Sequence, residues 1–349
     1  AAAPPGMWSW RFLAAALVGA GPAYGEEASP SSTYRIAYVA SSFYPDGSVA
    51  LWGQNSLDAV RMAVDDANRE GWCGPGCAIL LDDQFVFQAN GTAPSARLES
   101  FVETAVAAGV VAVLGADWGR VAEAVLAALG RLGAAGPPLV SAGATGAPLG
   151  KASLHPRFLR TAYSDLDGVG AVLQDLALRT NASKVAPGQL VLLYSKEAFG
   201  EAGRGSAKAL LGECGLELVA EGGFESNASV EEVRGLVRRL LPSASASRGT
   251  PAVFVSATGP DTTTAMLALA AEGILGPPAG GFAVGATEAA ASVVHSAEQA
   301  AAAAGYVGHL GDGPTPGACA AADAFGERFR GRFGRPPSGG FAAYSYDAV

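Results

Sequence analysis

The sequence predicts an α/β protein made of doubly wound parallel sheets. The first observation is a repeated unit that begins at Tyr34, in which a short apolar strand, a glycine-containing loop and an amphipathic helical segment follow one another. The second is the character of the strands, which are near-continuous apolar runs, as expected for parallel sheets covered by helices on both faces. The third is the length of 349 residues, which leaves room for two or three domains.

The expected strands are the short apolar runs of this unit. In chain order they are Tyr34–Ala40, Ala78–Asp82, Val110–Gly115, Leu139–Ser141, Leu190–Tyr194, Leu216–Ala220, Ala252–Ala257, Gly281–Gly285 and a segment near Tyr306–Leu310. The expected helices are the amphipathic runs between them. In chain order they are Gln54–Arg69, Ala96–Ala108, Val121–Leu132, Asp167–Thr180, Glu201–Cys214, Val230–Leu241, Thr262–Leu275 and Ala318–Phe333, together with the alanine-rich segment Ala297–Ala304.

The number of strands favours two lobes over one sheet. About nine strands exceed what one doubly wound sheet usually holds. A polar break near Arg160–Asp167 follows an isolated short strand, Phe158–Thr161. We expect the chain to pass from one lobe to the other there.

The composition excludes several classes of protein. With 50% hydrophobic and 16% charged residues, the chain is globular rather than disordered. The 23 Lys and Arg against 32 Asp and Glu give a net charge of −9, which repels nucleic-acid phosphates and anionic lipid headgroups. We therefore expect no nucleic-acid partner.

Residues 7–25 resemble a cleaved secretory signal peptide. Arg11 precedes an apolar run from Phe12 to about Gly19, and Ala23–Gly25 offers a cleavage site of the small-x-small type. The run is too short to span a bilayer, which needs roughly 20 apolar residues. A signal peptide predicts an exported protein. The alternative is that this segment is an unstructured, alanine-rich end of the chain.

Sequons and cysteines also indicate export. Three of the five asparagines, Asn90, Asn181 and Asn227, begin Asn-x-Ser/Thr sequences, which predicts glycosylation in a eukaryotic secretory pathway. Among the four cysteines, Cys73 and Cys77 flank a Gly-Pro-Gly turn, so a local disulfide is feasible, and two free thiols are the alternative. The cysteines and the three histidines lack the spacing of a zinc site, so we expect no metal.

Catalytic signatures do not fit the sequence. Residues 145–152 resemble a phosphate-binding P-loop but lack its first glycine and its metal-binding hydroxyl. The glycines of residues 200–205 have the wrong order for a dinucleotide-binding fingerprint. Ser141, His155 and Asp165 could be imagined as a catalytic triad, but closeness in sequence carries no geometry. We therefore expect a protein that is not an enzyme and has no cofactor.

The best candidate for a binding loop follows the apolar strand Leu139–Ser141. This loop, Ala142–Thr145, has small and hydroxyl side chains at the carboxyl end of a parallel strand, where open α/β sheets bind ligands. We expect it to offer free backbone N–H groups and hydroxyls to a small anion or zwitterion. The alternative is a glycine-containing loop selected for its turn geometry.

The order of several segments resembles a known family. In chain order these segments are IAYVASS, LWGQNSLDAVRMAVDDAN, VAVLGADWGRVAEAVLAAL, PLVSAGATGAPLG, PRFLRTAYSD, LLYSKEAFGEAG and FAAYSYDAV. They are similar to the receptor-family ligand-binding region, which has the type I periplasmic-binding-protein fold of leucine/isoleucine/valine-binding proteins and of metabotropic glutamate, GABA-B and natriuretic peptide receptors. The resemblance extends over Tyr34–Val349.

The resemblance implies two Rossmann-like lobes joined by a hinge, which close over a ligand in the cleft between them. The first lobe would contain residues 34–163 and the return 309–349, and the second residues 164–308. In the family three crossings join the lobes, and this chain ends inside a helix before the third crossing. We therefore expect a domain that is truncated at its C-terminus.

The resemblance also implies ligand-binding residues. Ser141, Ala144 and Thr145 match the hydroxyl loop of the amino-acid-binding members, in which Thr145 would bond the ligand head group. Phe199, before Gly200, takes the position of an aromatic residue and keeps its stacking surface without a phenol hydroxyl.

Two positions depart from the family pattern. Gly119 stands where a serine would contact the ligand carboxylate, and the neighbouring Arg120 could substitute for it. Thr287 stands where an acidic residue is expected, and Glu288, one place later, could reach a ligand ammonium group.

Residues after the first strand complete the candidate site. Trp52, Ser41 and Ser42 would line the mouth of the cleft. For Trp52 and Trp118, packing against the adjacent helix is the alternative to ligand stacking and the one we favour. We expect Asp117 to be a solvated loop charge.

Together these observations predict the extracellular, amino-acid-binding domain of a membrane receptor. The receptor assignment depends on the resemblance. The resemblance also implies that a segment outside this chain tethers the domain to the plasma membrane, and that the domain forms a homodimer through the first lobe. One alternative is the solute-binding component of an ABC-type importer, which has the same fold. A second alternative is a secreted α/β enzyme that uses the same cleft.

Overall fold

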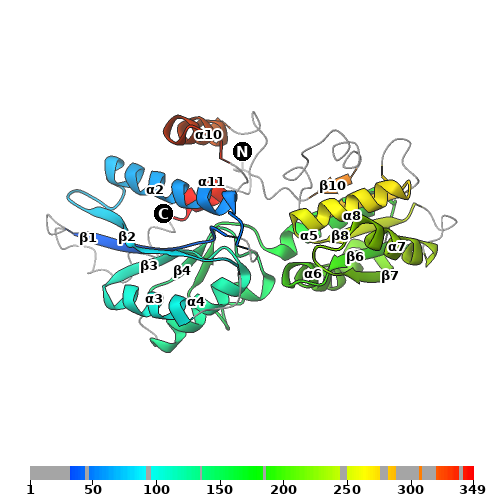
Figure 1. The fold of residues 1–349 in the computed structure, drawn as a ribbon, viewed down its shortest axis with the longest axis horizontal. Coiled ribbons are helices and arrows are strands. Elements are labelled where there is room, and N and C mark those ends of the chain that lie inside the picture. Colours follow the sequence, from blue (N-terminus) through cyan, green and yellow to red (C-terminus); the bar gives the residue numbers. More distant parts are fainter. Residues whose placement is uncertain are drawn as a thin grey trace, which may run out of the picture.

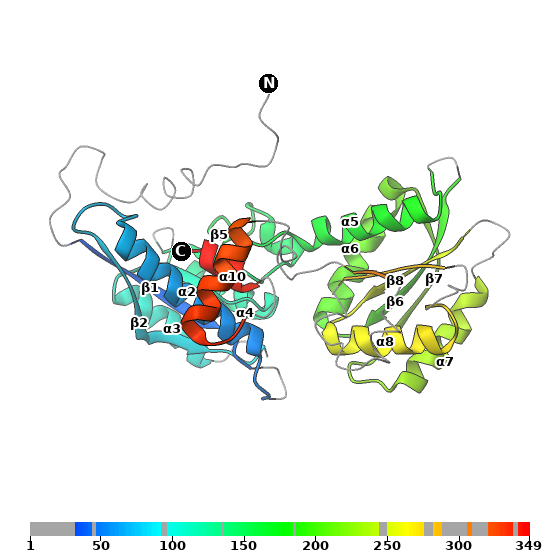
Figure 2. The same cartoon turned by 90° about the horizontal axis from the view of Figure 1, so that it is seen from above.

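The computed structural model describes residues 32–43, 47–91, 96–133, 136–183, 186–243, 250–275, 282–287, 306–308, 320–337 and 341–349. It contains two five-stranded parallel sheets, which lie side by side along the long axis of the molecule (Figure 1). Helices cover both faces of each sheet (Figure 2). The predicted α/β fold with two doubly wound lobes is confirmed.

The first sheet forms the left half of the molecule in Figure 1. Its strands are β1 (Thr33–Ala40), β2 (Ala78–Gln88), β3 (Val110–Gly115), β4 (Leu139–Ser141) and β5 (Phe158–Arg160), in the spatial order β2-β1-β3-β4-β5. Its helices are α2 (Leu51–Glu70), α3 (Ala96–Ala107) and α4 (Gly119–Arg131), with a short 3-10 turn, η1 (Ala147–Gly150), between β4 and β5. Along β1, Val39 packs toward α3 and α4, whereas Tyr38 packs toward α2. Alternate residues therefore face helices on opposite sides, which explains the continuous apolar runs.

The second sheet repeats this arrangement. Its strands are β6 (Gly188–Ser195), β7 (Leu216–Phe224), β8 (Ala252–Ser256), β9 (Ala283–Ala286) and β10 (Tyr306–Gly308), in the spatial order β10-β9-β8-β6-β7. Its helices are α5 (Asp165–Arg179) and α6 (Ala198–Cys214) on one face, and α7 (Val230–Leu240), the turn η2 (Leu241–Ser243) and α8 (Gly259–Ala271) on the other. Counted from the start of each lobe, the strand order is the same in both sheets.

The last two described helices, α10 (Ala320–Phe333) and α11 (Phe341–Asp347), pack against α2 of the first lobe (Figure 2). Arg328 Nη1 lies 2.7 Å from Asp66 Oδ2, and the Tyr346 hydroxyl donates a hydrogen bond to the same oxygen at 2.7 Å. The end of the chain is therefore held on the first lobe by both apolar and charged contacts.

The predicted strands and helices that fall on described residues are present, most of them with different ends. The edge strands β2 and β7 continue beyond the predicted Asp82 and Ala220, to Gln88 and Phe224. Their polar, half-exposed residues interrupt the apolar pattern, which an edge strand tolerates because it has a neighbour on one side only. The predicted helix Ala297–Ala304 and the signal peptide, residues 7–25, lie outside the described residues.

The disulfide between Cys73 and Cys77 is confirmed, with the two Cα atoms 5.7 Å apart. The side chains of Asn90, Asn181 and Asn227 are all exposed. Asn181 (φ 53°) and Asn227 (φ 66°) adopt the left-handed backbone conformation, which asparagine tolerates better than most residues. The backbone therefore gives two of the three sequon asparagines a structural role as well.

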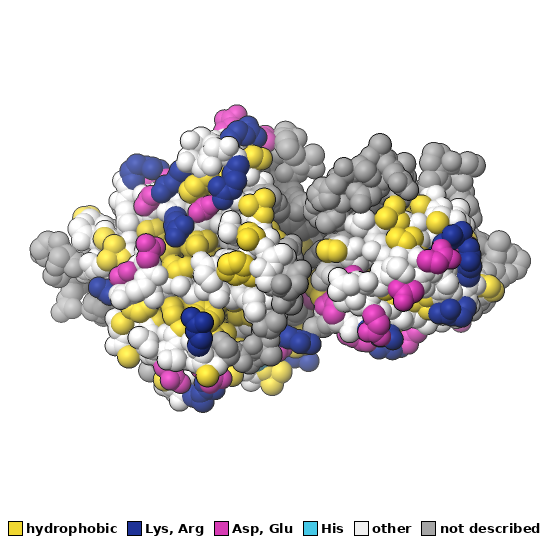
Figure 3. Space-filling view, in the orientation of Figure 1, with side chains coloured by type: hydrophobic (Ala, Val, Ile, Leu, Met, Phe, Trp, Pro, Cys, Tyr) yellow, Lys and Arg dark blue, Asp and Glu magenta, His cyan; other side chains and the backbone are white. Residues whose placement is uncertain are grey.

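Charged side chains are interspersed over the face of the molecule shown in Figure 3. Some form pairs, such as Arg204 Nη2 and Glu221 Oε1 at 2.7 Å. On this face the pairs leave no wide field of one sign of the kind that attracts nucleic acids. In the part of the chain that the structure describes, no helix combines the length and apolar character needed to cross a membrane.

Candidate ligand-binding site

The candidate site lies at the carboxyl ends of β1 and β3. The strand order of the first sheet reverses at this pair, because β2 lies on one side of β1 and the later strands on the other. In open α/β sheets, ligands bind at such a switch point, outside the carboxyl ends of the strands. The two segments that leave these strands are Ser41–Ser42 and Ala116–Trp118.

Asp117 is the charged group of this site, and it is buried. Only 5% of its surface is exposed. Its Oδ1 atom accepts hydrogen bonds from the Ser141 hydroxyl at 3.2 Å, the Ala142 N–H at 3.1 Å and the Gly143 N–H at 3.0 Å. The expectation of a solvated loop charge is therefore wrong, because three donors from the loop after β4 replace water around this oxygen.

A glycine permits this close approach of two loops. A Cβ atom at Gly143 would lie 2.6 Å from the Asp117 Cβ, closer than real side chains come. The fully buried Ser141 hydroxyl also accepts the Ala144 N–H at 3.0 Å. The N–H groups of Ala142, Gly143 and Ala144 are thus bonded within the protein, and the expectation that this loop offers them free to a ligand is wrong.

Burial controls the charge of Asp117. It raises the pKa of the carboxyl from 3.8 to about 6, although the hydrogen bonds to Oδ1 act in the opposite direction. The second oxygen, Oδ2, is buried and has no hydrogen-bond partner among the described residues, and the same is true of the Ser41 and Ser42 hydroxyls. Buried polar groups are nearly always bonded to protein, water or a ligand. These three atoms therefore mark a place where a bound water or ligand group is expected.

The start of α2 fixes the two serines. Gly53 lets the helix approach β1, because a Cβ atom there would lie 1.7 Å from the Ser41 carbonyl oxygen. The Ala50 N–H donates a hydrogen bond to the Ser42 carbonyl oxygen at 2.8 Å. The backbone after β1 is thus held in place while both serine hydroxyls remain without a described partner.

Two tryptophans flank this segment. Trp52, in α2, and Trp118, before α4, lie edge to face with ring centroids 5.5 Å apart. Trp118 also packs on the core between the sheet and α3. Each ring therefore has a packing partner within the protein. Arg120 is exposed on the first turn of α4.

Thr145 lies where the chain leaves the first sheet for α5. Burial raises the pKa of the Asp165 carboxyl, and a hydrogen bond with the Thr145 hydroxyl opposes this shift. The Thr145 carbonyl oxygen accepts the Asp165 N–H at 2.9 Å and Arg160 Nη1 at 3.0 Å. Thr145 thus connects the loop after β4 to the start of α5, and its hydroxyl already has a partner.

The second sheet has a comparable edge at the carboxyl ends of β6 and β8. Phe199 is half-buried at the start of α6. The Glu197 carboxylate accepts the N–H groups of Phe199 at 2.7 Å and Gly200 at 2.8 Å. Gly200 is required here, because a Cβ atom would lie 2.1 Å from the Ser195 carbonyl oxygen. Glu197 was not among the predicted residues, although an acidic residue directly before a helix is a capping signal.

Thr287 follows β9 and forms hydrogen bonds at the end of β8. Its buried hydroxyl donates to the Ala257 carbonyl oxygen and accepts the Ala257 N–H, both at 3.2 Å. The hydroxyl therefore joins β9 to the end of β8. Glu288, the acidic residue predicted to reach a ligand ammonium group, lies outside the described residues.

The structure brings one group of predicted residues together in the first lobe. They are Ser42, Trp52, Ser141, Ala144 and Thr145, which lie around the carboxyl ends of β1, β3 and β4 beside Asp117. Phe199 belongs to the second lobe. These residues lie on one lobe, beside the buried Asp117, which had been expected to be solvated.

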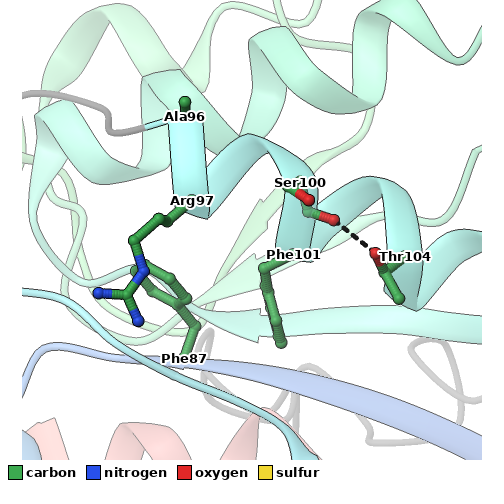
Figure 4. A pocket seen from close by; sticks show the side chains of 6 residues that line it. All are labelled: Phe87, Ala96, Arg97, Ser100, Phe101 and Thr104. Carbon is green, nitrogen blue, oxygen red and sulfur yellow. Dashed lines mark hydrogen bonds between the residues drawn. The ribbon is translucent and has the colours of Figure 1, made fainter.

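A separate open hollow of about 540 Å³ lies on the flank of the first lobe, between β2 and α3 (Figure 4). It is lined by Phe87, Ala96, Arg97, Ser100, Phe101 and Thr104. This hollow shares no residue with the Asp117 site. Within the described ranges, no three His, Cys, Asp or Glu side chains are grouped so that they could hold a metal ion.

A family model described as periplasmic binding protein matches residues 36–349. This range begins in β1 and ends after α11, so it includes both sheets and the candidate site. No curated protein matches the chain.

Proposed function

Because the chain belongs to the periplasmic binding protein family, we propose that it binds a small molecule between its two lobes, at the carboxyl ends of the strands. The observation that carries this proposal is the buried carboxyl of Asp117, whose Oδ2 atom has no described hydrogen-bond partner. The Ser41 and Ser42 hydroxyls, which follow the neighbouring strand, are also buried without a described partner. A buried polar group without a hydrogen-bond partner costs about 1–3 kcal/mol of free energy. A ligand that bonds these groups removes this cost.

We assign residues 34–163 and 309–349 to the first lobe and residues 164–308 to the second. The positions of the two sheets and of α10 and α11 support this division. Phe199 would contact the ligand from the second lobe when the lobes close, with Glu288 and Arg120 as further candidates. Ser141, Ala144 and Thr145 act by holding Asp117 and the first crossing in position.

We favour the extracellular domain of a membrane receptor, with an amino-acid-like ligand. The three exposed sequon asparagines and the Cys73–Cys77 disulfide support a secretory route. The solute-binding component of an importer is the second candidate, and the family itself supports it. Expression in a eukaryotic secretory host, followed by Asn-glycosidase, distinguishes them: a loss of mass favours the receptor, and an unchanged mass favours the importer component.

A thermal-shift screen tests the binding function. The library contains amino acids, amines, carboxylates, sugars and nucleosides, and calorimetry then measures the affinity of each ligand found. Ser42→Ala removes a buried hydroxyl at the proposed site, so it should weaken binding about 5- to 10-fold. Ser206→Ala, on α6, is the matched control and should leave binding unchanged. A library without any stabilising compound, or equal affinities in both variants, contradicts the proposed site.

A further inference from the structure

The loop after β4 already holds a carboxylate, and this carboxylate belongs to the protein. Asp117 Oδ1 accepts the donors of Ser141, Ala142 and Gly143. Such a cluster of hydroxyl and N–H groups is what a ligand carboxylate would otherwise use. A second carboxylate arriving here would find these donors bonded and would face a like charge, which is costly in a buried site.

The groups left for a ligand are acceptors. Asp117 Oδ2 is buried and unbonded, and an ionised carboxylate oxygen can only accept hydrogen bonds. The Ser41 and Ser42 hydroxyls, also buried and unbonded, can accept as well. The group that satisfies Oδ2 must therefore be a donor.

The negative charge of Asp117 lacks a balancing cation in the described part of the chain. The influences on its pKa are burial and three hydrogen bonds, with no Lys or Arg among them. A buried charge is normally paired, because the cost of removing it from water is large. A cationic donor from outside would supply both the missing bond and the missing charge.

We propose that the ligand presents an ammonium group to Asp117 Oδ2, so that its amine, and not its carboxylate, contacts the first lobe. An ammonium group carries three N–H donors, which equals the number of unbonded atoms on Asp117, Ser41 and Ser42. The ligand class is then primary amines, including amino acids that bind with their amine toward β1 and β3. This inference rests on the proposed function, because it assumes a small-molecule site at these strand ends.

Matched sets of small molecules test the orientation on the native chain. Each set contains an amino acid, the amine left after removal of its carboxylate, and the acid left after removal of its amino group. Leucine, phenylalanine and glutamate provide three such sets, and calorimetry at pH 7.5 compares the members. In any set that binds, the amine should stay within about 10-fold of the amino acid, and the deaminated acid should bind at least 10-fold more weakly than the amine.

Asp117→Asn tests the residue. It keeps an oxygen for the three donors from the loop after β4 and replaces Oδ2 by an amide NH₂, which donates. Affinity for the amine should fall about 10- to 150-fold, the range for one hydrogen bond to a charged group. Asp261→Asn is the matched control, because Asp261 is also buried and bonds the Ser226 hydroxyl at 2.9 Å and the Asn227 N–H at 3.0 Å. It should leave the affinity unchanged.

The outcomes separate this inference from the proposed function. Binding of deaminated acids as tightly as of amines, binding of neutral compounds alone, or unchanged amine affinity in a folded Asp117→Asn variant overturns the ammonium assignment and leaves a binding protein. If the variant does not fold, the matched sets on the native chain decide by themselves. The absence of binding by every compound class in the screen overturns both the assignment and the proposed function.

Discussion

The titration of Asp117 gives a quantitative test of the electrostatics at this site. Folding raises the pKa of its carboxyl from 3.8 to about 6, because burial removes water from the charged form. Below about pH 3 the carboxyl is protonated in the folded and in the unfolded chain. As the pH rises, the unfolded chain releases this proton first, so the free energy of unfolding falls. At about 1.4 kcal/mol for each pH unit, the loss reaches about 3 kcal/mol by neutral pH.

The assay is urea unfolding of the native chain and of Asp117→Asn at several pH values between 4 and 7.5. The free energy of unfolding of the variant minus that of the native chain should rise by about 2–2.5 kcal/mol across this range. The subtraction cancels other titrating groups, such as Asp347, whose pKa burial also raises to about 6. A difference that stays constant with pH would refute the account of Asp117 as a buried, unbalanced carboxylate.

Four further measurements test other parts of the structure. Gly53→Ala should lower the free energy of unfolding by about 2–3 kcal/mol, because the new methyl group meets the Ser41 carbonyl oxygen. Gly205→Ala, in open space on α6, should raise the free energy of unfolding by about 1 kcal/mol. Equal effects of the two substitutions in urea unfolding would contradict the close approach of α2 to Ser41. Replacing Cys73 and Cys77 together by serine should cost about 2 kcal/mol in the same assay, and an unchanged stability would show that the disulfide is not formed. Thr145→Val should destabilise the chain by about 1 kcal/mol, because it removes the hydrogen bond to Asp165. Ligand affinity measured by calorimetry should change less than 3-fold. A larger change in affinity would show that Thr145 contacts the ligand. Asn-glycosidase should reduce the mass of the secreted protein, and single Asn→Gln variants at residues 90, 181 and 227 should each lack one glycan. If none of the three substitutions changes the mass of the secreted protein by a glycan, the sequons are not acceptor sites.

The fold could be predicted because the relevant information is local. Buried parallel strands such as β3 and β4 are short apolar runs between glycines, prolines and polar residues, and their observed ends coincide with the predicted ones. The edge strand β7 was harder to delimit, because its half-exposed residues include polar ones that interrupt the apolar pattern. Helix α6 begins at Ala198, three positions before the predicted Glu201, because the Glu197 carboxylate caps its first turn.

The site was harder to predict because its contacts are not local. Asp117 lies in the short loop between β3 and α4, where an acidic residue is usually solvated. Its three donors come from residues 141–143, which are 24 to 26 positions further along the chain. One signal was available: an acidic residue two positions after a fully apolar strand, at the pair of strands where the order of the sheet reverses.

We expect a small molecule to bind at the carboxyl ends of the strands and to contact both lobes. Hydrogen–deuterium exchange of the native chain, with and without a ligand found in the screen, measures this contact. Exchange should become slower in Ser41–Phe43 and Ala116–Arg120 of the first lobe and in Lys196–Gly200 of the second, with little change in α3 or α7. Protection confined to one lobe, or centred on the hollow between β2 and α3, would contradict it.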